Sequence, residues 1–349
     1  MTIRDVAEMA RVSKGTVSKV LNGAPGVGAQ TRQRVLKLIE KLDFHPNATA
    51  RGLAARQSNT LGFIIPHTGR YTLTSTFWPV LLIAITEEAT RRGRNVLLST
   101  TQSEGDIDSA FRSILKGRRI DGAVIGAEMF GEMQLAELLV KNMPFVMVGR
   151  SPHLATHYVE VDNKCGARMA AEHLVSLGHT SLAVLAGPPQ LPYVADRVEG
   201  FLGVLRERGL REPVVVHCAY DTEETAACVT GILQGERPPT AIFLAAGDFV
   251  IGALRACQNI GRNVPKDVSL ISFDDHPFFP HLTPPITAVC QPLEEMGQAA
   301  VGMLFQLIAG QEPAQKAILL PPRLALRGSC AAPRSSAGTA PEVGGKSPL

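Results

Sequence analysis

The stretch that decides the fold is residues 3–22, IRDVAEMARVSKGTVSKVLN. Its apolar residues recur at helical spacing on both sides of a short interruption. They are Val6, Ala7 and Ala10 before it, and Val17, Val20 and Leu21 after it. Ser13 stands where its hydroxyl can accept a hydrogen bond from a free amide of the second helix, as an N-cap does. Two short helices joined in this way are typical of a helix-turn-helix, whose second helix lies in the major groove of DNA.

A third amphipathic helix follows, with a positive exposed surface. Its apolar residues are Val35, Leu38, Ile39 and Leu42, and its basic residues are Arg32, Arg34, Lys37 and Lys41. Residues 1–60 hold ten Lys or Arg against four Asp or Glu, a net +6 in a chain whose total is +3, so the remainder carries −3. This asymmetry points to a polyanionic partner for the N-terminal part alone. Taken by itself, the pattern also suits a small helical cap with a solvated basic face.

The continuation favours the DNA-binding interpretation. Residues 44–54 read FHPNATARGLA. Together with the first stretch, the chain carries the patterns D-V-A-x-x-A-x-V-S-x-x-T-V-S-x-V-L-N and P-N-x-x-A-R-x-L, and it resembles the LacI/GalR family of bacterial repressors. The resemblance continues to about residue 328. It implies a DNA-binding domain at 1–45, a hinge helix and linker at 46–59, and an effector-binding core at 60–330.

The resemblance also implies roles for individual residues in the head and hinge. Family positions that read base edges are Lys14, Gly15 and Lys19, and those that contact phosphate are Thr16, Asn22 and Thr31. Most relatives carry Arg at position 19, and Lys lacks the two-pronged fit of Arg to guanine. In the hinge, Asn47 belongs to the motif, small Ala50 permits close approach of two hinges, and Leu53 is expected to wedge into the minor groove. For Lys14 the alternative is a solvated lysine on the helix surface, and for the hinge segment it is a plain linker.

From residue 61, short apolar runs alternate with amphipathic stretches. Apolar strands that alternate with amphipathic helices predict parallel sheets covered by helices on both faces. The number of strand candidates, about eleven, is large for a single sheet, so two sheets are expected. The fold class is therefore α/β, and the resemblance implies a two-lobed, periplasmic-binding-protein-like core of doubly wound sheets. We expect one lobe at about 60–157 and 290–317, and the other at about 158–289 and 318–330. The tail 331–349 is rich in Pro, Gly and small polar residues, which predicts disorder.

Three motifs are expected to line a cleft between the lobes, because open α/β sheets bind ligands beyond the carboxyl ends of their strands. The resemblance makes Arg197 and Asp274 polar ligands of an effector, although surface salt bridges are the alternative. Gly247 stands where the family usually has Asn, which removes an amide that many sugar-binding members use. The aromatic candidates are Phe77, Trp78 and Tyr220, and their flat rings suit a pyranose or a purine equally, with core packing as the alternative.

Other functions have little support in the sequence. The chain lacks His-Glu-x-x-His, Gly-x-Ser-x-Gly and Gly-Lys-Ser/Thr motifs, so no catalytic site, metal site or cofactor is predicted. Its six cysteines lie far apart and are expected to be free thiols. Without an apolar signal segment or an apolar run near 18 residues, a cytoplasmic protein without membrane contact is expected. These features argue against a periplasmic binding protein and a sugar-modifying enzyme.

The sequence therefore predicts a homodimeric repressor that binds operator DNA and responds to a small effector between its lobes. A sugar is the expected effector, and a purine or nucleoside is the alternative. The effector's stabilisation of one lobe arrangement would set whether the paired hinges fold on DNA.

Overall fold

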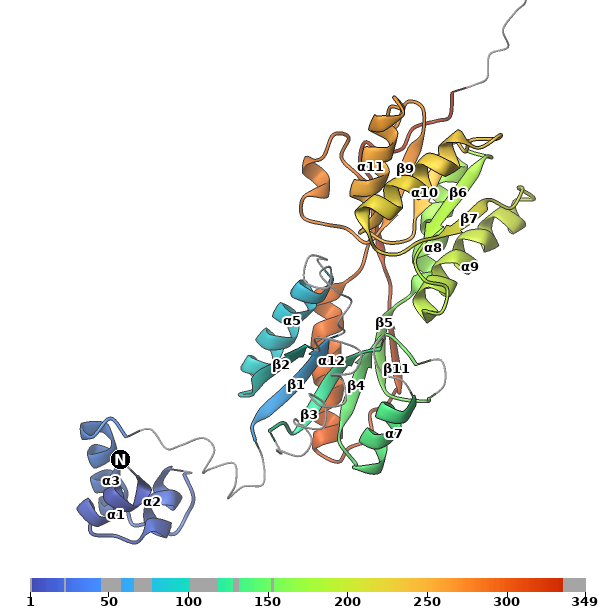
Figure 1. Cartoon of the computed structure of the whole chain (residues 1–349). Helices are drawn as coiled ribbons and strands as arrows, with labels where there is room; N and C mark the ends of the chain where they lie inside the picture. The colour runs from blue at the N-terminus through green and yellow to red at the C-terminus, as the bar shows by residue number, and fades with distance from the viewer. Residues whose placement is uncertain are drawn as a thin grey trace, which may run out of the picture.

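The computed structural model describes residues 2–21, 23–44, 58–65, 77–100, 119–127, 132–151 and 154–334. These residues form a three-helix head and two α/β lobes (Figure 1). The predicted fold class is confirmed.

The head consists of α1 (Ile3–Met9), α2 (Lys14–Leu21) and α3 (Ala29–Lys41). One cluster of apolar side chains packs the three helices together. Each helix is too short to be stable alone and depends on this packing. Its buried members are Val6, Ala7, Ala10, Val17, Val20, Val35 and Phe44.

Side-chain caps fix where the first two helices begin. Thr2 and Asp5 form a capping box at the start of α1. At α2 the Thr16 amide donates to Ser13 Oγ over 3.1 Å, which confirms the predicted N-cap. Gly28 precedes α3 and supplies no side-chain cap. Arg32 of α3 donates to the Ala24 carbonyl over 2.6 Å and so joins the helix to the loop before it.

The first lobe is built on a six-stranded sheet with the order β11-β5-β4-β3-β1-β2, in which all neighbours are parallel. Its described elements are β1 (Thr60–Ile65), α5 (Phe77–Arg91), β2 (Asn95–Thr100), β3 (Gly122–Gly126), α7 (Glu132–Val140), β4 (Phe145–Val148), β5 (Tyr158–Val161), α12 (Leu293–Ile308) and β11 (Ala317–Leu320). Strands β3 and β4 are buried along their whole length, as expected for parallel strands covered on both faces.

The second lobe repeats this plan with the sheet order β12-β10-β9-β8-β6-β7. Its elements are α8 (Asn163–Ser176), β6 (Leu182–Ala186), α9 (Pro192–Glu207), β7 (Val214–His217), α10 (Thr222–Gln234), β8 (Ala241–Leu244), α11 (Phe249–Asn259), β9 (Ser269–Phe273), the 3-10 turn η4 (Phe279–His281), β10 (Thr287–Cys290) and β12 (Arg323–Ala325). Only β12 is antiparallel to its neighbour in the described sheet.

The chain crosses between the lobes three times within the described residues, after β5, after β10 and after β11 (Figure 1). The predicted lobe boundaries at 157/158 and 317/318 are therefore wrong. Strand β5 pairs with β4, and β11 pairs with β5, so both belong to the first lobe. Pairing between distant segments decides which lobe a strand belongs to, and the apolar pattern of residues 158–162 does not indicate which strand it pairs with.

Two further differences lie near the C-terminus. Strand β12 was not predicted, because it has three residues and follows Pro321-Pro322. The predicted start of the disordered tail at residue 331 is too early. The Ala331 amide donates to Ser269 Oγ over 3.0 Å, and Arg334 pairs with Asp267 over 2.7 Å, so residues 331–334 pack on the second lobe. The rest of the tail lies outside the described residues.

Candidate functional site

Helix α2 presents its predicted base-reading residues to solvent. Lys14, Gly15 and Lys19 are exposed, whereas Val17 and Val20 of the same helix are buried against α1 and α3. The apolar face therefore fixes the helix, and the opposite face stays free for a partner. A surface of this kind suits insertion into the major groove.

The predicted phosphate contacts are less exposed. Thr16 and Thr31 are half-buried, and Thr16 Oγ1 lies 2.9 Å from Ser13 Oγ. Asn22 and the hinge residues Asn47, Ala50 and Leu53 lie outside the described residues, so their roles stay predictions.

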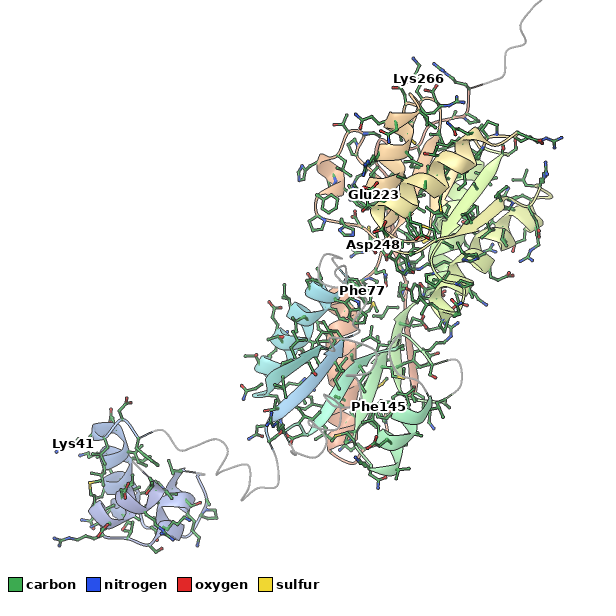
Figure 2. The ribbon with its side chains drawn as sticks, viewed as in Figure 1. Lys41, Phe77, Phe145, Glu223, Asp248 and Lys266 are labelled. Carbon is green, nitrogen blue, oxygen red and sulfur yellow. The ribbon has the colours of Figure 1, made fainter. Side chains whose placement is uncertain are left out.

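An open cavity lies between the lobes, at the carboxyl ends of the strands of the second sheet. Phe77 at the start of α5 faces it from the first lobe, and Asp248 before α11 faces it from the second (Figure 2). The full lining is Phe77, Asp248, Asp274, Asp275, His276, Cys290, Gln291 and Leu293. A molecule bound here contacts both lobes and the crossing after β10.

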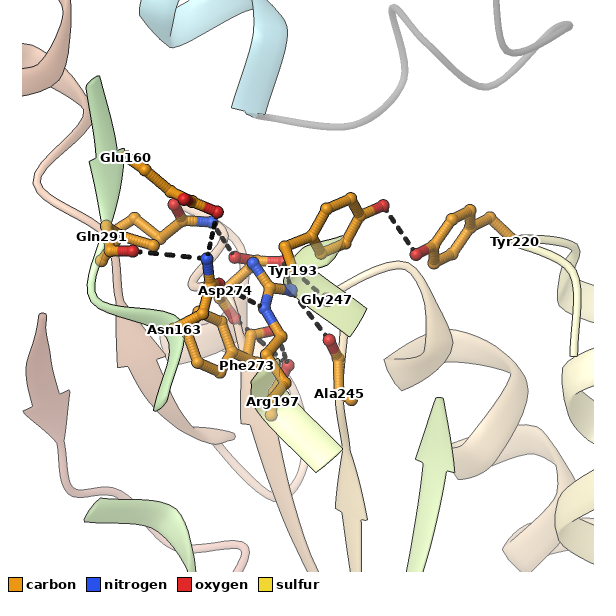
Figure 3. Close-up of polar contacts among 12 residues, drawn as sticks. Glu160, Asn163, Tyr193, Arg197, Tyr220, Ala245, Gly247, Phe273, Asp274 and Gln291 are labelled. Carbon is orange, nitrogen blue, oxygen red and sulfur yellow. Dashed lines mark hydrogen bonds and ion pairs between the residues drawn. The ribbon is translucent and has the colours of Figure 1, made fainter. Parts of the chain in front are cut away.

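Arg197 organises the second-lobe side of this cavity (Figure 3). It is 4% exposed, and the Cζ atom of its guanidinium lies 3.7 Å from the centroid of the Phe273 ring. Its Nε donates to Asn163 Oδ1 over 2.8 Å. Its Nη1 donates to the Ala245 carbonyl over 2.8 Å and to Asp274 Oδ2 over 3.3 Å. Arg197 thus joins α8, β8 and the end of β9, and it lies behind the cavity lining rather than in it.

Asp274 stands at the cavity wall because β9 ends there. Its φ of +74° is unusual for a residue with a side chain and turns the chain sharply after the strand. The carboxylate accepts from Gln291 Nε2 over 2.5 Å and from Arg197, with the Gly247 amide 3.5 Å away. Residues from β9, α9 and the β10 crossing therefore fix one acceptor group at the predicted ligand position.

The three predicted aromatic residues separate in the structure. Phe77 lines the cavity. Trp78 does not line it, because its ring is buried in the first-lobe core with the Phe63 centroid 6.2 Å away, as the alternative of core packing had it. Tyr220 stacks on Phe249, and its hydroxyl lies 2.8 Å from that of Tyr193 (Figure 3). It is not among the residues that line the described cavity.

A second polar cluster ties the lobes together near the crossing after β5. Arg150 of the first lobe lies 2.6 Å from Asp196 on α9 of the second lobe, and it donates to Glu160 over 3.0 Å. Glu160 also accepts from Asn163 Nδ2 over 2.9 Å, which links this cluster to Arg197. Burial raises the pKa of Glu160, despite the opposing effect of Arg150.

Burial, reinforced by the nearby Asp274 carboxylate, raises the pKa of Asp248 to about 6. The ionised form is therefore disfavoured in the folded state, so this group's stabilising contribution is present below pH ~4 and is lost as the pH rises through 6. We expect Asp248→Asn to be more stable than the wild type at pH 7.5, with a free energy of unfolding higher by at most about 3 kcal/mol. The difference should shrink toward pH 4. Calorimetric melting curves across this range test it, and a pH-independent difference contradicts it.

All six cysteines are free thiols. Within the described ranges, no three His, Cys, Asp or Glu side chains are grouped closely enough to hold a metal ion. No helix in the described part of the chain is long and apolar enough to cross a membrane.

Comparison with known proteins agrees with this architecture. The family described as bacterial regulatory proteins of the lacI family matches residues 2–47, and the periplasmic binding protein-like domain matches residues 171–330. The HTH-type transcriptional regulator MalR of Streptomyces coelicolor is 34% identical over 95% of this chain and 97% of its own length. The chain belongs to the LacI family.

Solved structures of similar proteins cover most of this LacI-family chain. The lac repressor dimer bound to operator and the anti-inducer ONPF has a TM-score of 0.84 at 28% identity, over 95% of this chain and 99% of its own. A complex of the transcriptional regulator CelR with cellobiose has a TM-score of 0.74 at 27% identity, over 94% and 99%. Such relatives are transcriptional regulators rather than enzymes.

Several cavity residues of this LacI-family protein were not predicted from the sequence. They are Asp248, Asp275, His276, Cys290, Gln291 and Leu293. Asp248 and Asp275 adjoin predicted positions, so the motifs pointed to the right loops. Residues 290–293 form the crossing after β10, and a polar residue between a strand and a helix at a lobe boundary was the available signal.

Proposed function

We propose that this protein is a homodimeric transcriptional repressor that binds operator DNA through α2, with the hinge at 46–59. Its operator affinity is controlled by a sugar bound in the cavity between the lobes. The observation that carries the proposal is the cavity lining, which combines Phe77 of the first lobe with Asp274 of the second. The relatives support it, since one is a dimer bound to operator and another is bound to cellobiose.

The coupling follows from the position of the cavity. An effector that contacts both lobes stabilises the lobe arrangement in which both sets of contacts are made. The first lobe continues directly from the hinge, so its position relative to the second copy governs whether the two hinges meet on DNA. Coupling free energies of this kind are typically about 1–3 kcal/mol, which corresponds to roughly 5–150-fold in operator affinity.

The charge of the lining favours an uncharged, hydroxyl-rich ligand. Asp248, Asp274 and Asp275 face the cavity, and no Lys or Arg is among its described lining residues. Arg197 and Arg327 neutralise Asp274 and Asp275 from behind, which leaves carboxylate oxygens as acceptors for hydroxyl donors. A phosphorylated sugar would bring its negative charge against these carboxylates, and we expect it to bind more weakly than the free sugar.

Two measurements test the function. DNA fragments selected from the source genome by the purified protein supply the operator, and fluorescence anisotropy gives its affinity. Thermal shift against a panel of mono- and disaccharides, sugar phosphates, nucleobases and nucleosides then finds the effector. The proposal requires a sugar that both stabilises the protein and changes operator affinity. A response to a purine or nucleoside alone would replace the sugar with the other effector class.

Lys19 provides a test of base reading by α2. If its ammonium donates to a base edge, Lys19→Ala should lower discrimination between operator and random DNA by about 1–3 kcal/mol. Lys37→Ala, on α3 of the same head, is the matched control for loss of one exposed positive charge. Salt titrations of both variants measure the effect. Equal losses on operator and random DNA would show that Lys19 contacts phosphate instead.

A further inference from the structure

In the second lobe, the His276 ring lies where a side chain at position 247 would extend. A Cβ at position 247 would lie 2.9 Å from His276 Cδ2, 3.0 Å from His276 Nε2 and 3.3 Å from Asp274 Cβ. Real Cβ atoms essentially never approach to less than 3.0 Å, so no side chain fits at position 247 while the ring keeps its place. The imidazole therefore fills the volume beside Asp274 into which an asparagine side chain at 247 would extend.

Aromatic packing holds the ring there. His276 lies 4.9 Å from the Phe279 ring at an interplanar angle of 30°, and 4.9 Å from the Phe278 ring at 51°. Phe279 is fully buried and anchors the 3-10 turn η4. The imidazole is thus packed against the ring that anchors η4 in the core of the second lobe.

One nitrogen of this ring lacks a hydrogen-bond partner in the described part of the chain. His276 is 6% exposed, and its Nδ1 is buried without a hydrogen-bond partner in the described part of the chain. Buried polar atoms in native proteins are nearly always hydrogen-bonded, so an orphan of this kind calls for an explanation. His276 also lines the cavity with Asp248, Asp274 and Gln291, so its imidazole borders the space that a bound molecule would occupy.

The protonation state of His276 fits the same interpretation. Burial lowers the pKa of this imidazole, although Asp274 and Asp275 oppose the shift. A neutral imidazole offers one N–H donor and one acceptor nitrogen. A carboxamide likewise offers donors and an acceptor, so His276 provides the hydrogen-bonding capacity of the asparagine that the family resemblance implies at position 247.

We propose that His276 binds the effector directly, through a ring nitrogen to a ligand hydroxyl, in place of the amide missing at position 247. This inference rests on the proposed function, because it assigns a further ligand residue to the same cavity. Gly247 and His276 then form a matched pair, because the imidazole can take this position only if residue 247 has no side chain.

Stability measurements on the unliganded full-length protein test the exchange of space. Gly247→Asn alone should destabilise the protein, because the new side chain meets the ring. His276→Ala should relieve that clash, so Gly247→Asn should cost much less stability in the His276→Ala background. Urea unfolding of the four proteins completes the cycle. Additive effects of the two substitutions would overturn the pairing.

Binding measurements test the role in recognition, with whichever compound of the panel above stabilises the wild type. Titration calorimetry should show that His276→Phe, which keeps the ring but has no nitrogen, weakens binding at least tenfold. His276→Gln should lose less, and the Gly247→Asn/His276→Ala double variant should recover much of the loss. His281→Phe, at the exposed end of η4, is the control and should bind like the wild type.

The outcomes separate the two proposals. Wild-type affinity in His276→Phe would overturn the role of His276 and leave the effector assignment standing. A panel in which no sugar stabilises the wild type would contradict the proposed sugar effector. If a nucleobase or nucleoside binds instead, the same variants decide the role of His276 with that ligand.

Discussion

Arg197→Met is expected to abolish the effector response while leaving the affinity of the unliganded protein for its operator unchanged. Arg197 donates hydrogen bonds to Asn163, Ala245 and Asp274 and so joins three segments of the second lobe. Methionine keeps much of the buried volume but leaves the Asp274 carboxylate without its cation. Removing one member of a buried ion pair typically costs about 3–5 kcal/mol of folding stability. The Asp274 carboxylate also loses a group that fixes its position, so its hydrogen bonds to the effector should weaken by about 1–3 kcal/mol, which corresponds to roughly 5–150-fold in effector affinity.

The control for this substitution lies on the same lobe. Arg168 makes a two-pronged pair with Glu207 between α8 and α9, but both side chains are well exposed. Arg168→Met should therefore change stability by no more than about 1 kcal/mol and leave the effector response intact. Arg197→Lys keeps the charge without the planar fork and should fall between the wild type and Arg197→Met.

Operator titrations with and without the stabilising compound measure the response, and melting curves show whether each variant is folded. A folded Arg197→Met protein whose operator affinity still responds fully to the effector would show that the Arg197 network is structural only. The outcome would place effector recognition on the cavity residues that Arg197 does not contact, such as Phe77 and Gln291.

Much of the fold was predictable because its determinants are local. Helix α2 follows from the spacing of Val17 and Val20 and from the Ser13 cap, each of which depends on neighbours within a few residues. The strands follow from short apolar runs, since a parallel strand covered on both faces needs them. The lobe boundaries failed for the opposite reason, because the pairing of β5 with β4 and β11 joins distant segments.

The site residues also differ in whether local sequence or long-range contacts determine their positions. Asp274 and Arg197 belong to local motifs, and the structure brings them to one network. The predicted direct contact of Arg197 with an effector stays a prediction, since its described bonds are to protein groups. His276 could not be identified as a partner of Gly247, because nothing in the sequence indicates that residues 29 positions apart share one volume. Trp78 was misplaced because a helix start near the cleft has one face toward the cleft and one toward the core.

Leu53→Ala is expected to lower specific operator affinity by about two orders of magnitude while leaving effector affinity unchanged. This prediction rests on the hinge motif, since Leu53 lies outside the described residues. An apolar wedge that unstacks a base step allows the DNA to bend and contact more protein. A methyl group is too short to do so, and the few kcal/mol of wedge energy are then lost.

Leu53→Met is the matched control, because methionine keeps a long apolar side chain and should retain most of the affinity. Anisotropy titrations give affinities for operator and random DNA, and fluorescence energy transfer across a doubly labelled operator reports the bend. Leu53→Ala should bind random DNA like the wild type, since that binding depends on the basic residues of the head. It should also bend the operator less. Wild-type affinity together with a wild-type bend in Leu53→Ala would show that residues 46–59 act only as a linker, and that operator specificity resides in α2 alone.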